Sequence, residues 1–253
     1  HKLEEVKAVS QRVYILRRGK LAGEEATETI SKKHLAHLMV GRDVVLTVKK
    51  GEREITGKSV FSVQNLSVKN DKGLPAVRDV SFTIRAGEIV GLAGVGGNGQ
   101  RELAEAIIGL RKEEKGTILF MGTNLCSMSI KERMNQGLSY VPEDRQKYGL
   151  VTDMKISENL IMGLHDKKPF VRGINRNYRE IYRVSEALVK EYDIRTHSID
   201  ETTANLSGGN QQKVILAREF SRNPGVLVVS QPTRGLDVGA IEFIHKEILT
   251  MRD

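Results

Sequence analysis

The sequence predicts an α/β fold with a central, mostly parallel sheet. Two apolar runs, EIVGLA at 88–93 and GVLVVS at 225–230, have the composition of strands that are buried on both faces. Apolar residues at helical spacing follow the first run. The chain has 253 residues and 39% apolar content, which allows one large α/β domain or two small ones and excludes a disordered chain.

Composition and charge limit the possible partners. Lys and Arg exceed Asp and Glu by 40 to 32, and the resulting charge of +8 favours phosphate compounds, nucleic acid or an anionic membrane face. The single cysteine, Cys126, excludes an intramolecular disulfide and a cysteine zinc cluster, as suits a reducing cytosol. No uninterrupted apolar run approaches the roughly 20 residues that span a bilayer. Because the chain begins at His1 without an initiator Met, we expect a fragment of a longer protein.

The N-terminal segment is expected to contain little structure of its own. Residues 1–45 predict a helix (KLEEVKAVS), a strand (RVYILRRG), a turn and a helix opened by Ser31, which is too little to bury a core. The following DVVLTVKKGEREITGKS is polar, carries several charges and lacks helical periodicity. We therefore predict a linker at 46–59 and a new domain at 60–253.

The elements of the new domain begin with strands. VFSVQNLSV at 60–68 and VSFTIR at 80–85 read as half-exposed antiparallel strands, since Val80, Phe82 and Ile84 alternate with polar residues. A helix is expected directly after Gly99, with an apolar face formed by Leu103, Ala106, Ile107 and Leu110. Further helices are predicted at 156–164 with Ser157 as a cap, at 177–192 with Ile181, Val184 and Leu188 on one face, at 209–222, and at 239–252.

The stretch GVGGNGQR joins the apolar run at 88–93 to this helix. A glycine-rich turn before a helix lets backbone N–H groups converge on phosphate oxygens. Two positions of the phosphate-loop pattern GxxxxGK(S/T) are changed, because Gln100 replaces the lysine and Arg101 the magnesium-binding hydroxyl. Loss of a charge-assisted bond costs about 1.5–3 kcal/mol, so magnesium-dependent binding should be weak. The expected phosphate-facing residues are Gly94, Gly96, Gly97, Asn98, Gly99, Gln100 and Arg101. A glycine turn that only permits tight packing is the alternative.

A second glycine motif, NLSGGNQQK at 205–213, carries a family resemblance. Together with the following VILAREFSRNPGVLVVSQPTRGLD, it resembles the signature, strand and D-loop succession of ABC-type ATPases. The Ser207 hydroxyl and the N–H groups of Gly208 and Gly209 open a helix and form an anion site. The resemblance implies that this site, with Asn210 and Asp237 in the same motifs, closes over the γ-phosphate of ATP in a partner domain.

The same resemblance implies that this domain's own hydrolytic site has degenerated. In the family pattern the strand before the D-loop ends in an Asp and a Glu, but this chain has Ser230 and Gln231, neither of which is a carboxylate. With Gln100 and Arg101, four positions depart together, so no intact catalytic residue and no metal ligand is expected. The stretch SVKNDKG also lacks the aromatic residue that stacks on adenine in the family.

The stretch YVPEDRQKYGLV, at 140–151, resembles the second ATPase half of sugar-type importers, as does DVGAIEFIHK after the D-loop. Glu143 takes the place of the loop glutamine that contacts the membrane partner. The resemblance therefore implies permease contacts in the 143–160 region. An exposed acidic turn formed by Glu143 and Asp144 is the alternative.

The whole pattern resembles the P-loop NTPase-like fold of an ABC ATPase, with an antiparallel β subdomain and a helical subdomain. It is most similar to the ATPase of bacterial nucleoside importers with a basic-membrane-protein type receptor, with sugar importers as neighbours. The N-terminal segment resembles the tail of a preceding half, with His1 as its switch histidine. The implied partners are that upstream half, permease subunits and, indirectly, the receptor; nucleic acid is not expected.

The implied cofactor is ATP, with magnesium only in the intact composite site, at the cytoplasmic face of the cell membrane. We expect the fragment alone to be hydrolytically inactive. A cytosolic ABC-type ATPase in translation or DNA repair is one alternative, and the charge of +8 supports it. A dense basic arm with interleaved aromatic residues, which would favour nucleic-acid binding, is lacking. A non-catalytic scaffold, in which Arg101 holds a phosphate directly, is another.

Overall fold

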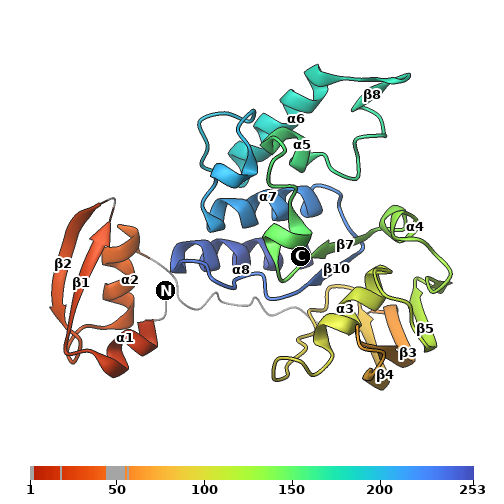
Figure 1. Ribbon diagram of the computed structural model, residues 1–253, viewed down its shortest axis with the longest axis horizontal. Helices are drawn as coiled ribbons and strands as arrows, with labels where there is room; N and C mark the ends of the chain where they lie inside the picture. The colour runs from red at the N-terminus through yellow and green to blue at the C-terminus, as the bar shows by residue number, and fades with distance from the viewer. Residues whose placement is uncertain (1–2, 18, 44–54, 56) are drawn as a thin grey trace. The chain divides into compact units, whose positions relative to one another are not determined.

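Residues 3–17, 19–43, 55 and 57–253 are described by the computed structural model (Figure 1). They divide into two units. One unit combines the described residues of 1–52 with Thr233–Met251, and the other holds the described residues of 53–232. His1 and most of the predicted linker at 46–59 lie outside the described residues. The predicted domain boundaries stay predictions.

The first unit contains a two-stranded antiparallel sheet and three helices. Its elements are α1 (Leu3–Val9), β1 (Arg12–Arg17), β2 (Lys20–Ala26), α2 (Lys32–Val40) and α8 (Val238–Arg252). Ser31 caps α2 as predicted, because its side chain accepts a hydrogen bond from the backbone N of His34 at 3.1 Å. Ile15, Ile30 and Leu35 form a small buried core, so the expectation that residues 1–45 contain too little to bury a core is wrong.

The second unit begins with a four-stranded antiparallel sheet in the order β4-β3-β5-β6. The strands are β3 (Ser59–Lys69), β4 (Pro75–Arg85), β5 (Lys115–Phe120) and β6 (Thr123–Asn124). The alternating Val80, Phe82 and Ile84 of β4 are half-buried, as predicted, and pack against the core. Helix α3 (Gln100–Ile108) contacts β3 and β4, and its buried Leu103 and Ile107 join the same core. The sheet therefore supports the helix that follows the glycine loop.

A parallel pair of strands, β7 (Leu138–Val141) and β10 (Val226–Val229), forms a separate sheet. The predicted strand at 225–230 is thus present, with half-buried residues. The strand predicted at 88–93 is wrong: these residues are in no strand, and the side chains of Ile89 and Leu92 are 49% and 54% exposed. An apolar run forms a buried strand only where a neighbouring strand satisfies its backbone hydrogen bonds. Within the described residues, β7 pairs with β10 alone, so residues 88–93 do not join this sheet.

Helices form the remainder of the second unit, apart from the short strands β8 (Val171–Arg172) and β9 (Asn175–Arg176). They are α4 (Ile130–Asn135), a π-helix (Arg145–Gly149), α5 (Ile156–Leu160), α6 (Tyr178–Glu191), a 3₁₀-helix (Thr203–Asn205) and α7 (Gly208–Phe220). Figure 1 shows α5, α6 and α7 grouped together, and all three contact one another. Helix α7 is buried from Gln211 to Phe220. Among the described residues, none of the helices has both the length and the apolar character required to cross a membrane.

Two details of the predicted helices are wrong. Ser157 does not cap α5, because the helix begins at Ile156 after Lys155, and Ser157 is buried within its first turn. Leu110 does not belong to the apolar face of α3 and is exposed, because Gly109 adopts a left-handed conformation (φ 85°) that ends the helix. Helical spacing alone did not reveal this stop.

A buried arginine closes the C-terminal end of α3. Arg133 is 2% exposed, and its Nη1 donates to the carbonyl oxygens of Ala106 at 2.6 Å and Ile107 at 2.9 Å. Its Nε donates to the carbonyl of Met128 at 3.2 Å. Burial lowers the pKa of Arg133. The positive charge is stabilised by carbonyl groups at the negative end of the helix dipole.

Candidate functional site

The glycine loop at 94–99 leads directly into α3 and ends in a tight turn at the start of the helix. Gly97 and Gly99 have left-handed conformations, with φ of 90° and 93°. Gly99 is the N-terminal cap residue of α3, and a Cβ there would collide with the carbonyl oxygen of Ala76. Position 99 therefore requires glycine. This requirement does not distinguish a phosphate-binding loop from a turn that only permits tight packing.

Gln100 folds back over the loop. Its Nε2 donates to the carbonyl oxygen of Val95 at 3.3 Å and lies against Gly94, where a Cβ would collide with the amide. The side chain at the lysine position thus satisfies a loop carbonyl, and it brings no charge to the loop.

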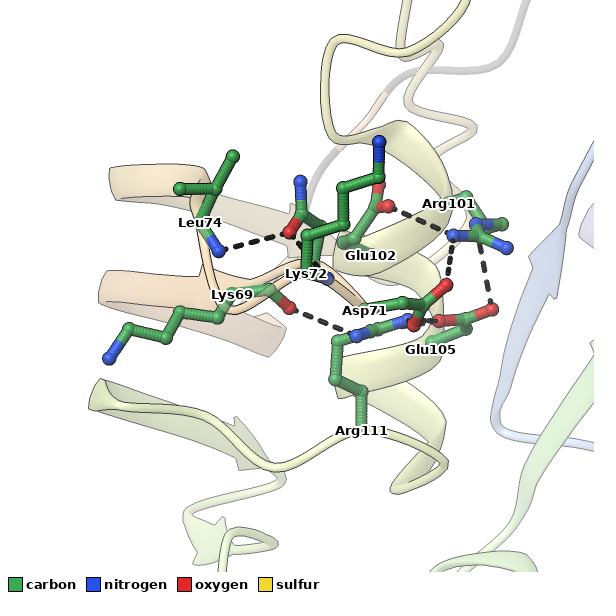
Figure 2. A network of polar contacts seen from close by, with 9 residues as sticks. Lys69, Asp71, Lys72, Leu74, Arg101, Glu102, Glu105 and Arg111 are labelled. Carbon is green, nitrogen blue, oxygen red and sulfur yellow. Dashed lines mark hydrogen bonds and ion pairs between the residues drawn. The ribbon is translucent and has the colours of Figure 1, made fainter.

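Arg101, at the position of the magnesium-binding hydroxyl, enters a network of ions shown in Figure 2. Its Nη2 lies 3.0 Å from Asp71 Oδ2 and 3.2 Å from Glu102 Oε1, and its Nε lies 3.8 Å from Glu105 Oε1. Arg111 Nη2 shares two of these carboxylates, at 2.6 Å from Asp71 and 2.7 Å from Glu105. Hydrogen bonds from Arg111 and Arg101 lower the pKa of Asp71.

This network joins the turn after β3 to the first turns of α3. Arg111 Nη1 also donates to the carbonyl oxygen of Lys69 at 3.0 Å, so backbone and side chains of the turn are both held. The hydrogen bond to Asp71 is the main cause that raises the pKa of Arg101. Because three carboxylates surround its guanidinium, the geometry does not favour the interpretation in which Arg101 holds a phosphate.

The two residues that follow β10, Ser230 and Gln231, carry a hydroxyl and an amide and no carboxylate. The backbone N of Ser230 donates to the carbonyl of Val141 at 2.9 Å, and its side chain hydrogen bonds with the phenol of Tyr140. Burial raises the pKa of Tyr140, so the phenol stays neutral. Gln231 follows with a left-handed backbone, φ 43°. No group of three His, Cys, Asp or Glu able to hold a metal occurs within the described part of the chain.

The signature segment forms the first turn of α7. Ser207 is the exposed cap residue: its Oγ accepts from the backbone N of Asn210 at 3.5 Å and from Asn210 Nδ2 at 3.1 Å. Asn210 Oδ1 in turn accepts from the backbone N of Arg195 at 3.0 Å. Gly208 and Gly209 are the first helical residues, and their N–H groups have no partner within the helix. An anion site at this turn is therefore compatible with the geometry.

A family model, ABC transporter, matches residues 77–234, which include both glycine motifs. The chain belongs to the ABC transporter family. It is 46% identical over 254 residues to the glucose import ATP-binding protein of Haloferax volcanii, covering 100% of this chain and 46% of the relative. It is 42% identical to the guanosine import ATP-binding protein of Bacillus subtilis, covering 97% of this chain and 48% of the relative. The chain spans about half the length of the curated relatives it matches.

Solved structures confirm the predicted ABC ATPase fold. An ATP-binding cassette in a dimeric post-hydrolysis state with ADP and Pi gives a TM-score of 0.65 at 20% identity, covering 76% of this chain and 83% of that one. A nucleotide-free ATP-binding cassette from an ABC transporter gives 0.61 at 21% identity, covering 77% and 78%. Similarity at this level of identity shows the fold alone.

Other predicted site residues of this ABC ATPase domain lie apart from the glycine motifs in the chain. Asp237 belongs to the first unit and caps α8, accepting from the backbone N of Ala240 at 2.9 Å. Asp144 is exposed and caps the π-helix, accepting from the backbone N atoms of Gln146 and Lys147, both at 3.1 Å. Glu143 is half-buried, so the exposed acidic turn consists of Asp144 alone. The permease contacts at 143–160 stay a prediction.

Arg145 and Gln211 are neighbours of the signature turn that the sequence alone did not indicate. Arg145 Nη2 would lie 2.6 Å from a Cβ on Gly208, and its Nε donates to Gln211 Oε1 at 3.4 Å. More than 60 residues separate the two segments along the chain. The spacing of residues along the chain does not indicate which helix Arg145 contacts.

The glycine requirement in the loop gives the first prediction. Replacing Gly99 with alanine should lower the free energy of unfolding by about 3 kcal/mol, because a Cβ there has a strained left-handed backbone and meets the Ala76 carbonyl. Gly96 has open space around its Cβ position, so Gly96→Ala should stay within about 0.5 kcal/mol. Urea unfolding of both variants measures the difference. Equal stability would contradict the close approach.

Proposed function

We propose that this chain is part of the ATP-binding subunit of a bacterial ABC importer for nucleosides or simple sugars. In this proposal it supplies Ser207, Gly208 and Gly209 to an ATP site whose glycine loop belongs to a partner half. One contrast within the second unit carries the proposal. The signature turn is accessible, whereas the glycine loop lacks the lysine and the magnesium ligand of the family pattern. Relatives named for guanosine, nucleoside and glucose import support the transport class.

The bonds around Ser207 support a role as a phosphate-binding donor. A hydroxyl has one proton and two acceptor positions. Both acceptor positions face donors of Asn210, so the proton is left to donate elsewhere. The exposed position of Ser207 directs this donation to an external acceptor, and the N–H groups of the first turn add to the attraction for an anion.

The residues around the domain's own glycine loop do not fit a magnesium ion. Magnesium prefers oxygen ligands in an octahedral arrangement. The first turn of α3 instead offers the guanidinium of Arg101, and the residue after β10 is Ser230, whose side chain hydrogen bonds with Tyr140. Gln231 is an amide and cannot act as a base on water. We infer that this site binds nucleotide weakly or is structural, and that hydrolysis belongs to the composite site, where magnesium would stabilise charge on the phosphates.

Partners and location belong to the same proposal. The upstream half of the polypeptide would hold the competent glycine loop, and His1 would be its switch histidine. Permease subunits would contact the 143–160 region, in which Tyr148, Val151 and Met154 expose apolar side chains. A receptor would act through the permease, and the protein would lie at the inner face of the cell membrane.

Nucleotide titration of this chain alone tests the proposal. We expect negligible ATPase activity and weak binding of ATP that magnesium does not strengthen, because neither the ammonium nor the carboxylates of a competent site are present. Fluorescent ATP with magnesium or with chelator measures the binding. Magnesium-dependent turnover that Gln100→Ala abolishes would overturn the proposal, and tight binding indifferent to chelator would favour a non-catalytic scaffold instead.

A further inference from the structure

We propose that Arg145 is a positioning residue for the signature turn, an inference that rests on the proposed function of Ser207, Gly208 and Gly209. Arg145 is the first residue of the π-helix, and its guanidinium lies against Gly208 at the start of α7. The atoms Nη2 and Cζ would be 2.6 Å and 3.2 Å from a Cβ at that position. Any side chain at 208 would displace the guanidinium.

The same side chain reaches the other end of the turn. Arg145 Nε donates to Gln211 Oε1 at 3.4 Å, and Gln146 Nε2 donates to the same oxygen at 3.4 Å. Gln211 is 2% exposed, and its Nε2 donates to the carbonyl of Thr203 at 3.0 Å. The first turn of α7 is therefore joined through Gln211 to the π-helix on one side and to the 3₁₀-helix that precedes the signature on the other.

The π-helix is itself fixed on α7 at a second point. Its last residue, Gly149, approaches the side chain of Ile215 so closely that a Cβ there would collide with it. At its other end Asp144 caps the π-helix. These contacts place Arg145 by packing, so its position does not depend on the weak Gln211 bond alone.

A positioning residue is needed here because of the composition of the turn. Glycine has the greatest backbone freedom and no side chain that could pack, so a Gly-Gly start is a weakly held helix end. Arg145 supplies packing where Gly208 has none. Its charge also lies beside a helix start whose first turn has no acidic residue, which favours an anionic ligand.

Arginine and lysine should differ at this position. The guanidinium lies against Gly208 through Nη2 while its Nε donates to Gln211, whereas the single ammonium of lysine can make only one of these contacts. A role that requires only positive charge would be filled by either residue.

The test uses the complete polypeptide that contains this chain, with its permease. For Arg145→Ala and Arg145→Lys we expect kcat of ATP hydrolysis to fall by about 10–100-fold, with less than about a twofold change in KM for ATP, because a displaced turn impairs the reacting geometry more than initial binding. Hydrogen exchange at the backbone N–H of Gln211, which donates to the carbonyl of Ser207 at 2.9 Å, should accelerate by about 10-fold, and that of α3 should not change.

Controls separate this inference from the proposed function. Arg183→Ala, at an exposed residue paired with Glu180 at 2.8 Å, should leave both readouts unchanged. Combining Arg145→Ala with Gln211→Ala should cost less than the sum of the single effects, as expected for groups in contact. If Ser207→Ala leaves hydrolysis intact, the proposed function fails. If Ser207→Ala abolishes hydrolysis but Arg145→Ala retains the wild-type kcat, or loosens the whole chain equally, the positioning role fails.

Discussion

Ser207→Ala in the complete polypeptide is expected to reduce ATP hydrolysis by at least about 100-fold, because removal of one preorganised donor to a phosphate in the transition state has an effect of this size. The loss should appear in kcat, measured as phosphate release at saturating ATP with magnesium. Stability should change by only about 1 kcal/mol, the usual cost of losing a helix cap. The large effect on rate and the small effect on stability distinguish a binding role from a capping role.

A second variant keeps the cap and changes the charge. Ser207→Asp retains an acceptor for the backbone N of Asn210, but it replaces the donor with a carboxylate that repels phosphate. We expect a stably folded, inactive protein. Ser207→Thr, which keeps the hydroxyl, should retain most of the activity. If Ser207→Asp hydrolyses ATP within about threefold of wild type, the contact between this turn and phosphate is contradicted.

Arg133→Ala is expected to have the largest effect on stability, lowering the free energy of unfolding by about 3–5 kcal/mol. The substitution removes the side-chain donor of the buried carbonyls of Ala106 and Ile107, of which Ala106 keeps the backbone N–H of Gly109 at 3.2 Å, and it opens a cavity beside Gly109. Urea unfolding at neutral pH measures the change.

Two control variants define the origin of this effect. Arg133→Lys keeps the charge but makes fewer of the carbonyl contacts, so its stability should lie between wild type and Arg133→Ala. Arg183→Ala removes an exposed ion pair and should stay within about 0.5 kcal/mol. An Arg133→Ala protein within about 1 kcal/mol of wild type would show that the carbonyls find other donors.

Local patterns predicted those elements whose signals lie within a few residues. The cap at Ser31 is such a case, because the hydroxyl and its backbone partner at His34 are three residues apart. Helix α6 is another: Ile181 and Leu188 are buried on one face as the helical period required. The family assignment also followed from the sequence, because the signature and D-loop motifs are contiguous.

Features that depend on distant partners could not be predicted in this way. The apolar run at 88–93 has strand composition, but its state depends on which strands pair with it. Strand β7 has only four residues, too few for a clear period. The bond between Arg101 and Asp71 joins residues 30 positions apart, and the approach of Arg145 to Gly208 arises only when the π-helix packs on α7. Chain order contains no direct signal for either.

Replacing Arg101 with the serine or threonine of a magnesium-binding loop would remove one of the two guanidinium groups that face the carboxylates around it. Asp71 and Glu105 would be left to share Arg111, and two carboxylates near one guanidinium repel each other. A lysine at position 100 would not relieve this, since Gln100 faces the loop carbonyl of Val95. Under the proposed function, a gain of magnesium binding at this loop would thus need several simultaneous substitutions, and the network would act as an evolutionary ratchet that keeps this glycine loop different from a competent one.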